Sequence, residues 1–390
     1  MTFWKTYKLD EVLDALIDYR GKTPKKTLSG IPLITAKIVK NGFIQKPNEF
    51  IAKEDYKGWM TRGIPKIGDV VLTVEAPLGE VAQIKTTNIA LAQRIITLRG
   101  KKGILDNGFL KYFLQSDVGQ NRLKERETGT TVTGIKQSEL RLVEIDFPDF
   151  ENQTRIASIL SSLDNKIELN RQTNQTLEAI AQTLFKEMCM PNGVELPDGW
   201  RIGKLVEIYK TTSGGTPSRE KIEYYEKGTI SWVKSKELGS FYVIETEEQI
   251  TETALKNSSA KILPENSILM AMYGATVAEI SILGKPATCN QAICAIIPNS
   301  EYPYSFVYEF LKAKRDEIKS MAVGAAQQNI SQVVIQGIEM VIPKQDVLFC
   351  FHRNVESIYL QIKTNIQESQ TLTTLRDNLL PKLMKGEIEI

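Results

Sequence analysis

The side chains that most often perform chemistry in proteins are scattered in this sequence. The four cysteines, Cys189, Cys289, Cys294 and Cys350, form no Cys-x-x-Cys pair, and His352 is the single histidine. A zinc site and a Ser-His-Asp triad each require a grouping of such residues that the sequence lacks. We therefore interpret the cysteines as buried thiols of a reducing compartment, and we predict no catalytic residue and no metal site.

Motifs for phosphate binding and methyl transfer are also incomplete. Gly21-Lys22-Thr23 resembles the end of a P-loop, but Leu16 stands where that motif requires glycine. The chain contains no Pro-Pro pair, so the Asx-Pro-Pro-aromatic loop of an adenine methyltransferase is missing. The sequence therefore favours binding over catalysis, and we predict no cofactor.

A second chemical set consists of polar side chains in loops and at the ends of expected strands. Arg, Lys, Asn and Gln read the edges of bases, whereas Ser, Thr and Lys hold phosphates. In the first half of the chain we predict DNA contacts from Lys22, Thr23, Thr35, Lys37, Lys40, Arg62, Gln93, Arg94, Thr130, Thr131 and Lys136. In the second half we predict them from Ser213, Thr216, Ser218, Arg219, Lys234, Ser235, Lys236, Tyr273, Asn290, Gln291, Gln327, Gln328 and Asn329. For each of these residues the alternative is an ordinary solvated loop position.

An internal repeat strengthens part of this set. When the 390-residue chain is shifted by half its length, residues 129–135 (GTTVTGI) meet residues 324–330 (GAAQQNI), and the tripeptide QTL at 175–177 returns at 370–372. Upstream of these segments the match persists with small changes of offset. The predicted contacts that recur are Thr23 with Thr216, Lys37 with Lys236, and Gln93 with Gln291.

Each half of the repeat ends in a long heptad pattern. Apolar residues alternate at steps of four and three, a pattern typical of helices that pack lengthwise on one another. The first seam is Ile156, Leu160, Leu163, Ile167, Asn170, Asn174, Leu177, Ala181, Leu184 and Met188, and the second is Phe351, Val355, Ile358, Ile362, Asn365, Ser369, Leu372, Arg376, Leu379 and Leu383.

The polar residues of the two seams indicate a register. Antiparallel helices with aligned centres would place Asn170 and Asn174 against Ser369 and Asn365. A parallel pair would also match polar with polar residues, so the pattern alone leaves both orientations open. A helix of about 33 residues is ~50 Å long.

The rest of each half predicts a mixed α/β (α+β) domain. Residues 31–100 contain short apolar runs separated by Gly, Pro and Asn, which predict strands. Residues 109–124 and about 304–321 read as amphipathic helices, and residues 1–20 as partly helical.

Charge and hydropathy narrow the class of protein only slightly. Net charge is +2, with 24 Lys and Arg against 18 Asp and Glu in residues 1–150. This modest basic excess is compatible with nucleic-acid binding. The N-terminus is unlike a signal peptide and no apolar run approaches ~18 residues, so we expect a cytoplasmic protein without a membrane segment.

Several short motifs, in order and over almost the whole chain, resemble the DNA-specificity subunit of type I restriction-modification systems. They are GDVVL at 68–72, APLGEV at 76–81, GTT at 129–131 before GIK at 134–136, LDNKI at 163–167, LPDGW at 196–200, GGTPS at 214–218 and LLPKL at 379–383. The seam residue Arg376 is a departure, because a small or apolar residue is expected there.

The resemblance implies two similar target-recognition domains, each reading one half of a bipartite site in double-stranded DNA. It also implies that the two long helices form an antiparallel coiled coil, which relates the two halves of the 195-residue repeat as a pseudo-twofold pair. A helix of this length spans about 15 base pairs, so we expect it to set the spacing between the half-sites. The expected segments are residues 1–150 and 191–345 for the recognition domains, and 151–190 and 346–390 for the helices. The partners implied are methyltransferase subunits, which carry S-adenosylmethionine, and restriction subunits.

Two other functions stay open on the sequence. One is a stand-alone DNA methyltransferase or nuclease, against which the missing motifs argue. The other is a coiled-coil assembly protein that binds no DNA, which salt-dependent binding to a bipartite duplex would exclude.

Overall fold

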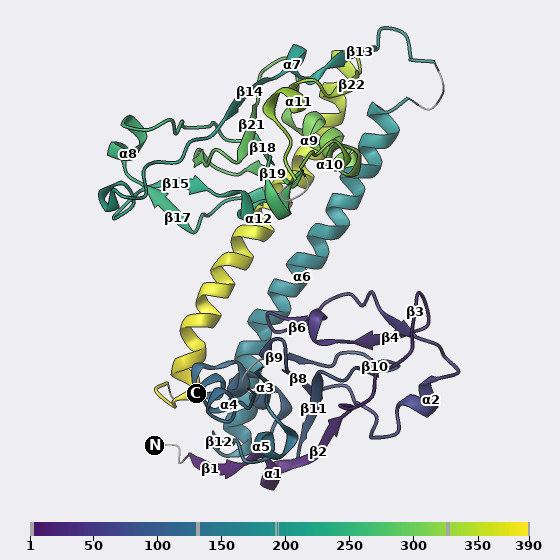
Figure 1. Cartoon of the computed structure of the whole chain (residues 1–390), viewed down its shortest axis with the longest axis vertical. Coiled ribbons are helices and arrows are strands. Elements are labelled where there is room, and N and C mark those ends of the chain that lie inside the picture. The colour runs from purple at the N-terminus through teal and green to yellow at the C-terminus, as the bar shows by residue number, and fades with distance from the viewer. Residues whose placement is uncertain (1–3, 130–132, 192, 194, 325–327, 389–390) are drawn as a thin grey trace. The chain divides into compact units, whose positions relative to one another are not determined.

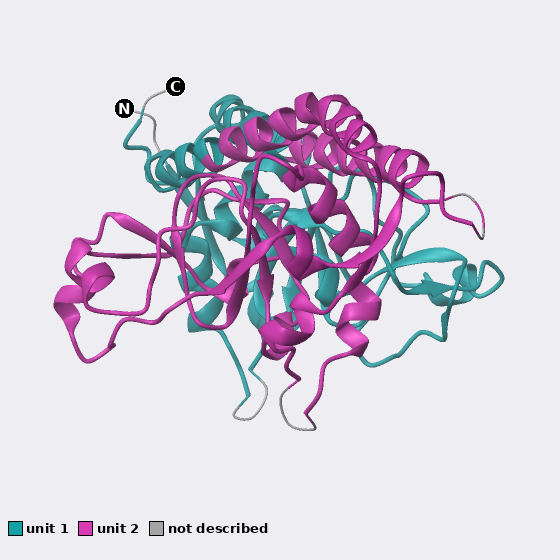
Figure 2. Cartoon of the chain, turned by 90° about the horizontal axis from the view of Figure 1, so that it is seen from above, with its two compact units in different colours: residues 1–167, 371–390 teal, residues 168–370 magenta. Residues whose placement is uncertain are grey.

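The computed structural model of the chain describes residues 4–129, 133–191, 193, 195–324 and 328–388. They form two compact units. Each unit consists of one mixed α/β part, here called its recognition part, and of segments of both long helices. Unit 1 comprises residues 1–167 and 371–390, and unit 2 comprises residues 168–370, as the two colours of Figure 2 show.

Unit 1 contains two four-stranded sheets and short helices. Its strands are β1 (Lys5–Lys8), β2 (Leu13–Asp18), β3 (Lys26–Thr27), β4 (Ile31–Ile34), β5 (Val39–Lys40), β6 (Phe43–Ile44), β7 (Phe50–Ile51), β8 (Val70–Val74), β9 (Leu78–Gln83), β10 (Ala90–Leu91), β11 (Ile95–Gly100) and β12 (Glu144–Phe147). Its short helices are α1 (Leu9–Val12), α2 (Tyr56–Trp59), α3 (Asn107–Gln115), α4 (Asp117–Glu125) and α5 (Gln137–Arg141). The sheets have the orders β2-β11-β8-β9 and β10-β4-β7-β3, and β1 pairs with β12.

Unit 2 repeats this plan. Its strands are β13 (Arg201–Lys204), β14 (Lys210–Ser213), β15 (Ile230–Val233), β16 (Tyr242–Val243), β17 (Glu248–Ile250), β18 (Ile268–Ala271), β19 (Ile280–Leu283), β20 (Thr288–Cys289), β21 (Ile293–Ile297) and β22 (Glu339–Ile342). Its short helices are α7 (Leu205–Ile208), α8 (Glu252–Lys256), α9 (Tyr304–Ala313), α10 (Arg315–Ser320) and α11 (Gln332–Gln336).

The sheets of the two units correspond strand by strand. The order β14-β21-β18-β19 matches β2-β11-β8-β9, the trio β17-β15-β20 matches β7-β4-β10, and β13 pairs with β22 as β1 does with β12. The correspondence is incomplete, because unit 2 adds β16 at one edge of its larger sheet, and β3 and the β5–β6 pair of unit 1 have no counterpart among the strands described for unit 2. The predicted duplication of a mixed α/β domain is thereby confirmed.

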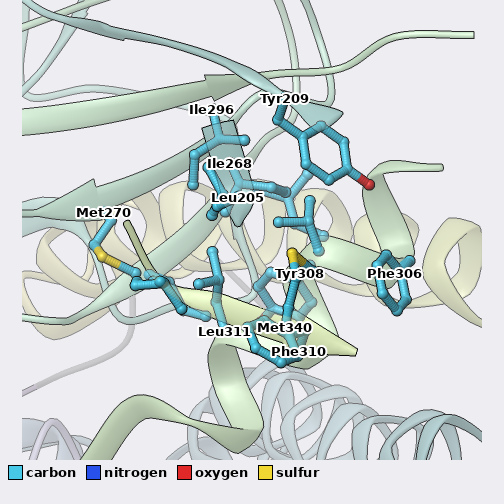
Figure 3. Packing of buried hydrophobic residues seen from close by; sticks show 14 of the residues in the cluster. Leu205, Tyr209, Ile268, Met270, Ile296, Phe306, Tyr308, Phe310, Leu311 and Met340 are labelled. Atoms are coloured by element: carbon cyan, nitrogen blue, oxygen red, sulfur yellow. The ribbon is translucent and has the colours of Figure 1, made fainter. Parts of the chain in front are cut away.

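Burial explains why the apolar runs became strands. Every residue of β8, sequence VVLTV, is buried. Val70, Leu72 and Val74 pack in one apolar cluster, while Val71 packs in another on the opposite face of the sheet. A strand covered on both faces needs a continuous apolar sequence rather than an alternating one. In unit 2 the equivalent core gathers Ile268, Met270 and Ile296 of the sheet around aromatic residues of α9 (Figure 3).

Two uninterrupted helices carry the heptad seams. They are α6 (Phe150–Cys189) and α12 (Gln345–Met384), the longest ribbons in Figure 1. Every predicted seam position on both helices is buried or half-buried. Asp164, Phe185 and Tyr359 are buried as well, although they lie outside the seam. These three face the sheets and α-helices of their own unit, so each long helix buries a wider stripe than a two-position seam.

The helices run antiparallel within each unit. In unit 2, Asn170 Nδ2 lies 3.3 Å from Ser369 Oγ, and Asn365 Nδ2 donates to Asn174 Oδ1 at 2.7 Å. These contacts confirm the predicted polar register. In unit 1, Arg376 donates to Asp164 Oδ1 at 3.0 Å, which gives the cation on the second seam a buried partner. None of the helices among the described residues is long and apolar enough to cross a membrane.

The helical part of residues 1–20 is the turn Leu9–Val12, and residues 13–18 form strand β2, which pairs with β11. Two predictions of a single unbroken helix were wrong. The single helix expected over 109–124 is broken into α3 and α4 at Ser116, whose hydroxyl accepts from Gly119 N and caps the second helix. The helix expected near 304–321 is divided in the same way into α9 and α10.

In both units a buried tyrosine–carboxylate hydrogen bond joins the recognition part to a long helix. The tyrosine lies on the recognition part in unit 1 and on the long helix in unit 2. In unit 1, Tyr112 of α3 donates to Asp164 of α6 at 2.7 Å. In unit 2, Tyr359 of α12 donates to Glu309 of α9 at 2.8 Å. Asp164 also receives cations, whereas the position equivalent to Arg376 in unit 2 is the buried Ala181.

This difference predicts opposite acid–base behaviour. Burial alone would raise the pKa of Asp164, but Lys111, Tyr112 and Arg376 together hold it below its ordinary value. Burial raises the pKa of Glu309 to about 7, against weaker lowering by Tyr359 and Lys312. Among the described residues, Glu309 Oε2 is buried without a hydrogen-bond partner.

We expect Glu309 to make unit 2 more stable in mild acid. Its folded pKa lies above the unfolded value of about 4.3, so its contribution is fully present below that value and is lost as the pH rises through 7. Each unit of pKa shift is worth about 1.4 kcal/mol, so the dependence between pH 5 and 8 should reach a few kcal/mol. Hydrogen exchange of β18 and β21 amides at several pH values would measure it.

Two variants should change the pH dependence of unit 2 stability in opposite directions. Glu309→Gln should flatten the pH dependence, because an amide does not titrate. Tyr359→Phe should steepen it, because the hydroxyl that stabilises the carboxylate is lost. A Glu309→Gln profile parallel to that of the unaltered protein would contradict the assignment.

Candidate nucleic-acid interface

In each unit, two parallel strands bring predicted contact residues to one edge of a small sheet. In unit 1, β4 runs parallel to β10, with Leu33 opposite Ala90 and Ile34 opposite Leu91. In unit 2, β15 runs parallel to β20 in the same manner. Parallel strands end at the same edge, and ligands of open α/β sheets bind outside those carboxyl ends.

The carboxyl ends of β4 and β10 line a pocket in unit 1. Its volume is ~290 Å³. Five predicted contacts line it: Thr23, Thr35, Lys37, Gln93 and Arg94. Thr23 Oγ1 donates to Gln93 Oε1 at 3.2 Å, so these two recurring positions meet directly. The sequence prediction therefore gathered residues that are distant in the chain but adjacent in space.

The remaining predicted contacts of unit 1 lie outside this pocket. Lys22, Lys40 and Lys136 are exposed on other segments. Arg62 donates to the backbone oxygens of Asp18 and Arg20 at 3.0 and 2.8 Å. These hydrogen bonds fix the backbone at the end of β2, so the Arg62 guanidinium has a structural role. Thr130 and Thr131 lie outside the described residues, as does Gln327 of the second half.

The equivalent edge of unit 2 collects the second set. Lys234, Ser235 and Lys236 follow β15, and Asn290 and Gln291 follow β20. The Asn290 amide donates its backbone N–H to Val233 O at 2.9 Å. Its side-chain Oδ1 is buried and accepts no hydrogen bond from the described residues. A ligand donor is one group that could satisfy this oxygen.

A second segment joins this edge in unit 2. Asn329 bridges to Tyr273, and Gln328 O accepts from Gly274 N at 3.0 Å. The loop expected to contact a ligand is thereby attached to the end of β18. In unit 1, Gly134 bridges to Glu75 after β8, so this attachment recurs. Ser213, Thr216 and Ser218 are half-buried or exposed on the preceding segment.

Three predicted contact residues of unit 2 form ion pairs with carboxylates that were not predicted. Arg219 lies 2.6 Å from Glu248, Lys234 lies 2.7 Å from Glu248, and Lys236 lies 2.6 Å from Glu247. These side chains hold the pKa of Glu247 down to about 2 and lower that of Glu248. The rings of Tyr225 and Trp232 lie 4.3 and 4.9 Å from the Arg219 guanidinium and fix its position.

A similar ion pair exists in unit 1, where Lys26 Nζ lies 2.8 Å from Glu49 Oε2, although this buried oxygen accepts no hydrogen bond of normal geometry from the described residues. Both residues line the pocket. The sequence does show that the two cations are equivalent, because Lys26 and Arg219 each stand two residues after a Thr-Pro pair.

Known proteins match the chain along both halves. The model of the type I restriction modification DNA specificity domain matches residues 1–179 and again residues 197–367. The chain belongs to this specificity family.

Relatives in the specificity family cover nearly the whole chain. The type I restriction enzyme MjaIX specificity subunit of Methanocaldococcus jannaschii is 31% identical, over 95% of this chain and 90% of that protein. The HindI specificity subunit of Haemophilus influenzae is 25% identical over the full length of both. The type I S subunit structure from M. genitalium shares the fold with a TM-score of 0.65 and 20% identity, covering 98% of this chain and 96% of that one.

Membership of the specificity family agrees with the two-copy architecture. The two matched segments end within α6 and α12 respectively, so each includes one recognition part and the start of one long helix. The predictions of family, fold class and a specificity subunit are thereby confirmed. The individual contact residues and the four-segment domain boundaries stay predictions.

Proposed function

We propose that this chain is the DNA-specificity subunit of a type I restriction-modification complex. Each recognition part would read one half of a bipartite target in double-stranded DNA, as the family and the repeated fold suggest. The observation that carries the proposal is the recurrence, at the carboxyl ends of parallel strands in both units, of side chains that bind bases and phosphates. We propose residues 1–150 and 191–345 as the two readers.

The chain acts in this proposal without catalytic groups of its own. Methyltransferase subunits, which carry S-adenosylmethionine, modify adenine, and restriction subunits cleave. The antiparallel helices α6 and α12 provide the frame on which these partners assemble, in the cytoplasm. The scattered cysteines and the single histidine of the sequence support a chain without catalytic groups.

Mapping methylated adenines in cells with and without the gene tests this function. We expect a bipartite methylated sequence that disappears when the gene is deleted. The recurring glutamines sharpen the experiment. Gln93→Ala should relax or weaken recognition in one half-site, and Gln291→Ala in the other, each by about 1–3 kcal/mol for a lost base contact.

Arg62→Ala serves as a contrast, because its guanidinium binds backbone oxygens and its loss should affect folding rather than one base. An unchanged methylation map after gene deletion would refute the proposal. Methylation or cleavage of DNA by the purified chain alone would favour the enzyme alternative instead.

A further inference from the structure

An ion pair recurs in the two units even though their recognition parts have diverged. Lys26 pairs with Glu49 at 2.8 Å, and Arg219 pairs with Glu248 at 2.6 Å. The carboxylates occupy equivalent places on the small sheet, because Ile51 lies opposite Ile31 on β4 and Ile250 lies opposite Ile230 on β15. The cations occupy equivalent places after the Thr-Pro pairs.

Carboxylates are unfavourable on a surface that binds a polyanion. Each lysine or arginine that contacts a phosphate releases counterions and adds to sequence-independent affinity. A cation that already contacts a carboxylate gives no such gain until the pair opens. Both pairs therefore lower the affinity of this surface for DNA in general.

The pairs are also weak enough to exchange. The Arg219 and Glu248 side chains are 52% and 32% exposed, and those of Lys26 and Glu49 are 47% and 22% exposed. Partly exposed ion pairs contribute little to stability, so a phosphate held at the right place can replace the carboxylate. The stacking of Arg219 on Tyr225 and Trp232 keeps its guanidinium in position during such an exchange.

We propose that Glu49 and Glu248 are specificity-determining residues that restrain Lys26 and Arg219 from binding phosphates of non-target DNA. Docking of the correct half-site brings a phosphate close enough to displace the carboxylate. This inference rests on the proposed function and adds a discriminating role that acts against wrong sequences rather than for the right one.

Glu49→Gln and Glu248→Gln test it, because the amide keeps the shape and removes the charge. The full chain, in complex with its methyltransferase subunits, is titrated with the mapped target duplex and a scrambled duplex at several salt concentrations. We expect each variant to bind the scrambled duplex about 5–10-fold more tightly near 0.1 M salt and to steepen the salt slope by about 0.9. Target affinity should change less, so discrimination falls.

Three controls isolate the effect. Glu207→Gln breaks a comparable pair, Arg201–Glu207 at 2.7 Å, on β13 and α7 at another end of unit 2 (Figure 1), and should leave binding unchanged. Lys26→Met combined with Glu49→Gln should return scrambled-duplex affinity to the starting value, because no cation remains to be released. Thermal melting verifies that all variants fold.

The outcomes separate the two proposals. If the unaltered complex fails to distinguish target from scrambled DNA, the proposed function is wrong and this inference falls with it. If the complex discriminates but the glutamine variants leave non-target affinity and salt slope unchanged, only this inference is wrong. A change in the preferred base at one position would also overturn it, because it would make the glutamate a base reader.

Discussion

Replacing Asp164 with alanine should destabilise unit 1 by about 3–5 kcal/mol, the effect seen when one partner of a buried ion pair is removed. The Asp164 carboxylate receives Lys111 Nζ at 2.6 Å, Tyr112 Oη at 2.7 Å and Arg376 Nη1 at 3.0 Å. Lys111 is 6% exposed, and burial already lowers its pKa despite Asp164. Without the carboxylate a buried ammonium and a tyrosine hydroxyl lose their acceptor.

Hydrogen exchange gives this measurement an internal reference. Amides of β8 and β11 in unit 1 should exchange faster in Asp164→Ala, while those of β18 and β21 in unit 2 report the background. The other partner of Arg376 is Asp377, whose side chain is 58% exposed. Asp377→Ala should therefore lower the free energy of unfolding by at most about 1 kcal/mol.

A compensated variant distinguishes charge from packing. Lys111→Met combined with Tyr112→Phe and Asp164→Leu replaces the buried pair and its tyrosine donor by apolar groups, leaves Arg376 paired with Asp377, and should restore most of the stability. Equal exchange rates in unaltered protein and Asp164→Ala would show that the cluster contributes little.

Removing one heptad from each long helix should abolish methylation at the original target and create a new one with a shorter spacer. The matched segments are residues 168–174 and 365–371, which contain the polar residues Asn170, Asn174, Asn365 and Ser369. Seven residues of helix are about 10.5 Å, or about 3 base pairs. Both half-sites should keep their sequences, because each recognition part is unchanged.

Methylation mapping with the shortened chain measures the spacer directly. Duplicating the same heptads is the matched test and should lengthen the spacer by about 3 base pairs. Deleting seven residues from only one helix is the control, because unequal lengths disrupt the paired seams and should eliminate methylation. A shortened chain that methylates the original spacer would contradict the role of the helices as a ruler.

The long helices were the part of the fold most accessible from the sequence. A heptad pattern repeats one physical requirement many times, so a few ambiguous residues such as Asn170 do not obscure it. Their direction required the structure, since the polar layer fits either orientation. The burial of Tyr359 and Asp164 was not predicted, because the heptad pattern identifies only the helix face that packs on the other long helix. These two residues lie on the face that packs on the recognition part.

The candidate interface was predictable by residue type but not by arrangement. Thr23, Lys37 and Gln93 were predicted from their residue types and loop positions, their recurrence strengthened the prediction, and the structure places them around one pocket. Arg62 was selected for its charge, yet its hydrogen bonds are to backbone oxygens. Glu49 and Glu248 were not predicted, because carboxylates repel DNA, and only the structure shows that they contact Lys26 and Arg219.

The composition of unit 1 has a consequence for the order of events during protein synthesis. Its core includes Ile156 and Leu160 from the first half of the chain together with Leu383 and Met384 from the last residues. At ~5–20 residues per second, the ribosome needs roughly 10–40 s to add the intervening stretch of about 220 residues. Unit 2 is continuous in sequence and is complete first. The nascent N-terminal part must wait with an apolar face uncovered, which makes it a natural client for a chaperone until the C-terminal turns of α12 emerge.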